Sequence, residues 1–184
     1  MRIGLGNRGA IMASSRGRAA LAAVMLGLCL GLTLAPRAAR AGDPSYIAVG
    51  AGIYDVLHDF KAAQGRLEFR FADRFVFIKP MVGVLFTSKG SVMGYGGIRI
   101  DLYLGPHIVV TPNGAVGAFY RGNGKNLGST IEFKTGGEFA WRFDDHSRLG
   151  LAFDHISNAG IGKHNPGTES LILFWSFPIG SVQH

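Results

Sequence analysis

After about residue 45, the chain is built from short segments in which apolar and polar residues alternate. Side chains of a β-strand point alternately to its two faces, so a period of two predicts strands and argues against helices. Glycine, asparagine and aspartate separate the segments, and these residues favour turns because they tolerate the backbone conformations that turns need. We expect eight strands, at residues 46–57, 64–72, 75–87, 91–103, 107–120, 129–143, 148–157 and 169–178.

Several of these segments have one apolar, aromatic face and one face with charges of both signs. Leu67 and Phe69 share one face of their segment, whereas Arg66, Glu68 and Arg70 share the other. A soluble sheet with its charged face in water gives the same alternation. An even number of strands of about ten residues with aromatic-rich apolar faces instead favours a transmembrane β-barrel, with lipid outside and paired charges in a narrow lumen.

The predicted fold class is therefore all-β: an eight-stranded antiparallel up-and-down transmembrane β-barrel. The alternative is a soluble, lipocalin-like barrel, which would turn its apolar face inward.

The net charge of +7 comes almost entirely from the first 41 residues, which contain six arginines and no acidic residue. Subtracting those six from the 19 Lys and Arg leaves 13, against 12 Asp and Glu, so the rest of the chain carries +1. We find no clustered basic surface there of the kind that nucleic acids need, and we expect no nucleic-acid partner.

The same 41 residues predict a secretory signal peptide. A basic start is followed by the apolar run Ala19 to Leu34 and by the small-x-small sequence Ala39-Arg40-Ala41. An uncleaved anchor is the alternative, but the run is shorter than the roughly 20 residues of a spanning helix. We expect cleavage near Ala41 and one mature barrel domain, residues 42–184. That domain has no cysteine, since Cys29 is in the leader.

The candidate chemistry lies in the last two expected strands. His155 and Ser157 share a face because they are two residues apart, about 7 Å between Cα atoms. If the two strands pair, Glu169 returns beside them on the same face. That face contacts lipid, where a carboxylate is costly and typical of function. With both termini in the periplasm, the site lies at the extracellular rim and meets lipids of the outer leaflet.

These residue types suit nucleophilic acyl transfer. Ser157 is the candidate nucleophile, His155 the base that removes its proton, and Glu169 the carboxylate that orients the imidazole. Donors for the oxyanion are expected from the connecting loop, namely the side chain of Asn165 and a backbone N–H near Gly160.

The motif His155-x-Ser157-Asn158-Ala159-Gly160, then Asn165-Pro166-Gly167-x-Glu169 and a final aromatic strand, resembles the lipid A 3-O-deacylase family, PagL. The resemblance is specific over about residues 155–178 and elsewhere rests on strand count and leader. It implies a bacterial outer-membrane enzyme that hydrolyses the ester-linked 3-position acyl chain of lipid A without a metal or other cofactor.

The resemblance also implies site residues and a partner. Its catalytic triad corresponds to His155, Ser157 and Glu169, with Asn158 and Asn165 at or beside the oxyanion site. The expected partner is lipid A or lipopolysaccharide of the outer leaflet. Whether the protein forms a homodimer is left open.

Alternative interpretations remain for single residues and for the whole chain. Asp154 is a poor partner for His155 because its parity turns it into the lumen, and His164 lacks further ligands at metal-binding spacing. His58, His107, His146 and His184 are interpreted as turn or rim residues. The rival functions are a non-enzymatic structural barrel and another lipid-acting barrel, a phospholipase or an acyltransferase.

Overall fold

The computed structural model describes residues 43–73 and 75–179, so the predicted signal peptide and the last five residues lie outside the described residues. Within that part of the chain, no helix is both long and apolar enough to cross a membrane. The strands are β1 (Ser45–Tyr54), β2 (Ala62–Arg70), β3 (Ile78–Thr87), β4 (Val92–Ile100), β5 (Leu102–Leu104), β6 (Ile108–Tyr120), β7 (Ile131–Arg142), β8 (Arg148–Ser157) and β9 (Thr168–Ile179).

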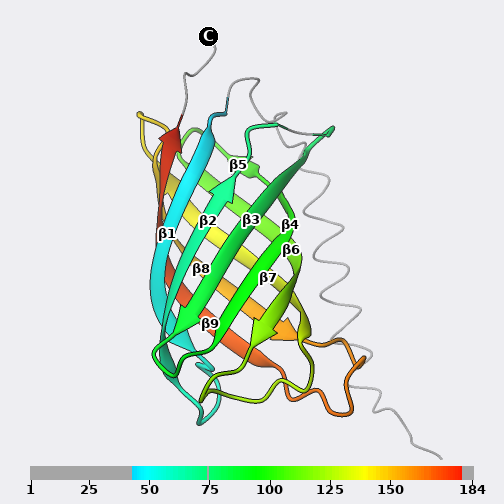
Figure 1. The fold of residues 1–184 in the computed structure, drawn as a ribbon. Coiled ribbons are helices and arrows are strands. Elements are labelled where there is room, and N and C mark those ends of the chain that lie inside the picture. The colour runs from blue at the N-terminus through cyan, green and yellow to red at the C-terminus, as the bar shows by residue number, and fades with distance from the viewer. Residues whose placement is uncertain (1–42, 74, 180–184) are drawn as a thin grey trace, which may run out of the picture. The chain divides into compact units, whose positions relative to one another are not determined.

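The strands close into an antiparallel barrel, because β1 pairs with β9 and β4 pairs with β6 (Figure 1). β4 and β5 both pair with β6 in one continuous register, Arg99 opposite Asn113 and Leu102 opposite Val110. They are two parts of one strand, which is interrupted opposite Pro112, a residue with no N–H to donate. The predicted eight-stranded barrel is confirmed.

Two strand ends differ from the expected ones by three residues, and the other ends differ by at most two. The first strand ends at Tyr54 instead of residue 57, because Asp55 has a positive φ of 57° and starts a turn. The third strand begins at Ile78 instead of residue 75, because Val76 also has a positive φ, 61°. Both residues turn the chain, and the earlier turn after β1 brings its loop towards β9.

The barrel has two rims. We call the end with Ser45 and Ile179 the terminal rim, at the top of Figure 1. The opposite end, with the connections 55–61, 88–91, 121–130 and 158–167, is the loop rim. The two longest connections, 121–130 and 158–167, both lie at the loop rim.

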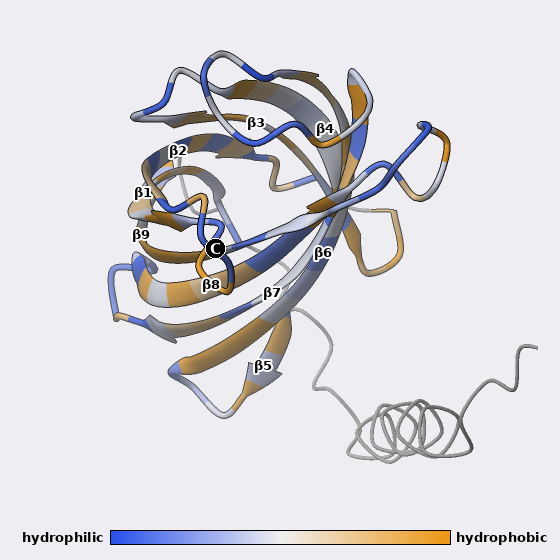
Figure 2. Ribbon diagram, turned by 90° about the horizontal axis from the view of Figure 1, so that it is seen from below, coloured by the Kyte–Doolittle hydropathy of each residue, from blue (hydrophilic) through white to orange (hydrophobic). Residues whose placement is uncertain are grey.

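The charged faces of the strands line the inside of the barrel. Arg66, Glu68 and Arg70 are buried, whereas Leu67 between them is 46% exposed on the outer wall. Figure 2 shows this alternation of hydrophobic and hydrophilic residues along the strands. The arrangement is that of a membrane barrel and the opposite of a soluble lipocalin-like barrel.

Several of the buried charges pair across the lumen. Arg66 donates to Asp154 at 2.9 Å and to Glu138 at 3.1 Å, and Arg70 donates to the same Glu138 oxygen at 2.6 Å. Near the terminal rim, Lys79 donates to Asp43 at 2.7 Å and to Asp101 at 3.0 Å. Pairing offsets the cost of burying these charges, so this network is the polar core of the barrel.

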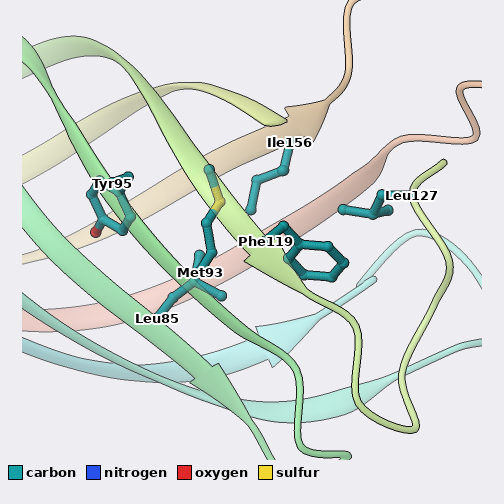
Figure 3. Packing of buried hydrophobic residues seen from close by; sticks show 6 residues of the cluster. All are labelled: Leu85, Met93, Tyr95, Phe119, Leu127 and Ile156. Atoms are coloured by element: carbon teal, nitrogen blue, oxygen red, sulfur yellow. The ribbon is translucent and has the colours of Figure 1, made fainter. Parts of the chain in front are cut away.

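An apolar cluster lies in the lumen towards the loop rim (Figure 3). Leu127, from the loop between β6 and β7, packs with side chains from four strands. The cluster comprises Leu85, Met93, Tyr95, Phe119, Leu127 and Ile156. Through Leu127, the cluster packs against the loop between β6 and β7.

Candidate active site

The expected pairing of the last two strands is present, and it places His155 directly opposite Glu169. His155 Nδ1 lies 3.0 Å from Glu169 Oε1, within hydrogen-bond distance. The His155 side chain is 44% exposed and that of Glu169 is 16% exposed. A carboxylate that contacts one ring nitrogen of a histidine fixes its tautomer and orientation.

The pair lies on the outer wall of the barrel. Phe153 and Leu171, the next residues on the same face, are exposed hydrophobic side chains. Asp154 points the other way, is buried, and contacts Arg66 and Lys134 at 2.9 and 3.0 Å. Its exclusion as the partner of His155 is therefore correct.

Ser157 is the last residue of β8 and lies two residues beyond His155 on the same face, half-buried. Among the described residues, no hydrogen bond joins its hydroxyl to the His155 ring. Because Nδ1 faces Glu169, Nε2 is the nitrogen left for a hydroxyl. Such contacts are often long in unliganded sites and shorten when substrate binds.

Gly167 lies against the His155 ring. A Cβ at this position would be 2.9 Å from Cε1 and 3.6 Å from Nε2 of His155, and Gly167 has a φ of +59°. A side chain here would strain the backbone and push against the imidazole. In the sequence, Gly167 stands out only as part of the motif that resembles the PagL family.

The loop between β8 and β9 is held together by Asn158. Its buried Nδ2 donates to the carbonyls of Leu127 and His164, both at 2.8 Å. Its Oδ1 accepts the N–H of Gly160 at 2.9 Å, so the expected oxyanion donor at Gly160 is engaged within the loop.

Asn165 is the exposed member of this group. Its Oδ1 accepts the backbone N–H of Asn158 at 3.0 Å. In the contacts of residues 43–73 and 75–179, this oxygen is the one side-chain atom of Asn165 that makes a hydrogen bond, and its Nδ2 hydrogens make none.

Residues 62–178 match the family model described as "Lipid A 3-O-deacylase (PagL)", which is more than half of the chain. The chain belongs to the PagL family. The resemblance recognised at residues 155–178 is thus correct, and the match extends back to β2.

Solved structures show the same fold. The crystal structure of the outer membrane enzyme PagL is similar with a TM-score of 0.59 and 21% identity, over 73% of this chain and 99% of that one. A de novo designed transmembrane β-barrel is similar with a TM-score of 0.54 and 10% identity, over 75% and 97% of the two chains. A comparison with curated proteins yields no match.

Two residues near the site precede the part that matches the PagL family. Barrel closure pairs Tyr54 with Ser170, and the next residue, Asp55, begins the loop beside Glu169. His58 Nδ1 lies 3.2 Å from Glu169 Oε2. The sequence predicts His58 as a turn or rim residue and gives no signal for Asp55; only closure of β1 on the last strand brings the two beside Glu169.

Asp55, His58 and Glu169 each offer one atom to a metal ion, and these atoms lie within 4.8 Å of one another. However, Asp55 Oδ1 already accepts from Lys125 Nζ at 2.6 Å and from Thr168 at 3.0 Å, and its Oδ2 accepts the Phe60 N–H. An ammonium group on this carboxylate repels a cation. We therefore interpret the group as an ion-pair network.

Proposed function

We propose that this protein hydrolyses the ester bond of the 3-position acyl chain of lipid A in the outer membrane. The observation that carries the proposal is the His155–Glu169 contact of 3.0 Å on the lipid-facing wall of a PagL-family barrel. Ser157 on the same face supplies the hydroxyl. Charged and polar groups beside hydrocarbon are costly, so their clustering there supports a role in acting on lipid.

The position of the site supports a lipid of the outer leaflet as substrate. Outer-membrane barrels have short periplasmic turns and longer extracellular loops. The two longest connections lie at the loop rim, whereas β1 begins and β9 ends at the terminal rim. The site therefore faces the outer leaflet near the extracellular surface.

In the proposed reaction, Ser157 Oγ attacks the acyl carbonyl while His155 Nε2 takes its proton. Glu169 keeps Nδ1 protonated and stabilises the imidazolium. The Nδ2 hydrogens of Asn165 are the proposed donors to the oxyanion. His155 then returns the proton to the 3-hydroxyl of lipid A as the C–O bond breaks. Water, deprotonated by His155, then attacks the acyl-enzyme. The bond between Ser157 Oγ and the acyl group breaks, the fatty acid leaves, and His155 returns the proton to Ser157 Oγ.

Replacing Ser157 with alanine tests the proposal. Lipid A from cells that express the unaltered protein should lose one 3-hydroxyacyl chain, measured by mass spectrometry. In Ser157→Ala the rate should fall by at least about a thousandfold, because the nucleophile is absent.

The matched control is Ser88→Ala, because Ser88 lies in the β3–β4 turn of the same rim, away from the triad. It should act like the unaltered protein. Identical lipid A with and without Ser157 would overturn the proposal. An added acyl chain, or lysophospholipid beside intact lipid A, would assign the barrel to another lipid chemistry.

A further inference from the structure

The loop between β1 and β2 brings a second histidine to the candidate triad. Glu169 uses Oε1 for His155, and its other oxygen, Oε2, is buried without a hydrogen bond. His58 Nδ1 lies 3.2 Å from Oε2, at ion-pair distance but outside hydrogen-bond alignment. The Glu169 carboxylate is thus flanked by two imidazoles, one on each oxygen.

Asp55 holds this loop in place. Its side chain is buried, and Asp55 Oδ1 lies 3.4 Å from the same His58 Nδ1 that faces Glu169. It accepts from Lys125 of the β6–β7 loop and from Thr168, the first residue of β9. The neighbouring Val56 N–H donates to the backbone carbonyl of Glu169 at 2.9 Å. Three chain segments therefore meet at one carboxylate beside the site.

We infer that His58 is a positioning residue for Glu169 and that Asp55 anchors it there. A glutamate held through one oxygen still rotates about its terminal bond, and each rotation weakens its contact with His155. A donor at Oε2 restricts that rotation. It also offsets the loss of hydration of a carboxylate that faces hydrocarbon. The Nδ1–Oε2 contact is expected to shorten into a hydrogen bond when substrate closes the site.

This inference rests on the proposed function and adds to it. Asp55 and His58 precede residues 62–178, which match the PagL family, so the triad motif does not include them. His58 does not touch the reacting atoms in this scheme, and it acts only through Glu169.

The test uses purified protein in detergent micelles with lipid A, and separates kcat from KM by following the released fatty acid. His58→Leu keeps the volume of the side chain and removes its N–H donor. We expect kcat to fall about tenfold, because that factor corresponds to the loss of one hydrogen bond to a charged group. KM should stay within about twofold, because the substrate contacts are unchanged. His58→Asn should restore most of kcat, since its Nδ2 takes the place of Nδ1.

A double variant shows whether His58 acts through Glu169. In a Glu169→Ala background, the residual turnover should not change when His58→Leu is added, because the carboxylate that His58 positions is gone. His164→Leu is the matched control, an exposed histidine in the β8–β9 loop. It should leave kcat unchanged.

The failures are distinguishable. If His58→Leu equals the unaltered protein while Ser157→Ala is inactive, the positioning role is wrong and the hydrolase proposal stands. A loss that persists in the Glu169→Ala background, or that His58→Asn does not relieve, also overturns the positioning role. If Ser157→Ala retains full activity, the proposed function itself fails.

Discussion

At the scale of single residues, the site depends on how Asp55 is ionised. Burial opposes ionisation, but hydrogen bonds from Lys125 and Thr168 outweigh it and hold the pKa of the Asp55 carboxyl below its usual value. The unfolded loop then binds the proton more readily than the folded one. Stabilisation by Asp55 is therefore complete above the ordinary aspartate pKa of about 3.9 and is lost as pH falls through the lower folded-state pKa.

Hydrogen exchange at the Phe60 amide tests whether the stabilisation by Asp55 is lost as pH falls. The Phe60 N–H donates to Asp55 Oδ2 at 3.0 Å, so its protection factor should be high near neutral pH and should fall in acid. In Asp55→Asn the protection should be low at every pH, because the charge that holds Lys125 is absent. Asp59→Asn, an exposed position in the same loop, should behave like the unaltered protein. Equal, pH-independent protection in all three proteins would contradict the role of Asp55.

At the scale of elements, the β8–β9 connection does more than join two strands. Asn158 binds the carbonyl of Leu127, which packs in the apolar cluster below the loop rim (Figure 3). This hydrogen bond attaches the loop to the apolar cluster. Gly167 of the same loop lies against the ring of His155, the base of the proposed reaction. Sites on supported loops keep their geometry because the packing below restricts their motion.

Gly167→Ala tests that contact. The added methyl group should displace the His155 ring and lower kcat by about a hundredfold, the cost of a misplacement of about 1 Å. Gly105→Ala is the matched control, because Gly105 also has a positive φ, 79°, but has nothing within 4 Å of an added Cβ. Both variants carry backbone strain, so an equal loss of activity in the two would refute the specific contact with His155.

At the scale of the whole molecule, stability comes from an inverted arrangement, with apolar side chains outside and ion pairs inside. Glu138 accepts from Arg66 and Arg70 on the opposite part of the wall. Such bonds across the lumen join strands that are not neighbours in the sheet, β2 and β7. Removing this carboxylate leaves two buried guanidinium groups with less compensation.

Glu138→Leu should therefore lower the free energy of unfolding by about 3 kcal/mol or more, as for other buried pairs that lose one partner. Urea unfolding in lipid vesicles, followed by heat-modifiable gel mobility, measures the change. Phe139→Leu is the control, since Phe139 is exposed on the outer wall and should cost far less. Equal costs for the two substitutions would argue against the ion network as the polar core.

Much of the barrel is predictable because alternation is a local property. In three consecutive residues, Arg66 and Glu68 are assigned to one face of the strand and Leu67 to the other. Likewise, His155 and Ser157 share a face because they are two residues apart. The break at Asp101 and the early end of β1 at Asp55 were not predicted, since both depend on backbone details that alternation does not report.

The sequence by itself therefore determined the strand pattern, the membrane-barrel class, the PagL resemblance and the residues proposed as the triad. Only the tertiary structure decided that His58 and Asp55 lie beside Glu169 and that Asn158 holds the β8–β9 loop in place through its hydrogen bonds. The physical reason is barrel closure. The register of β1 on β9 joins residues more than a hundred positions apart, such as Tyr54 and Ser170, and no local pattern encodes that pairing.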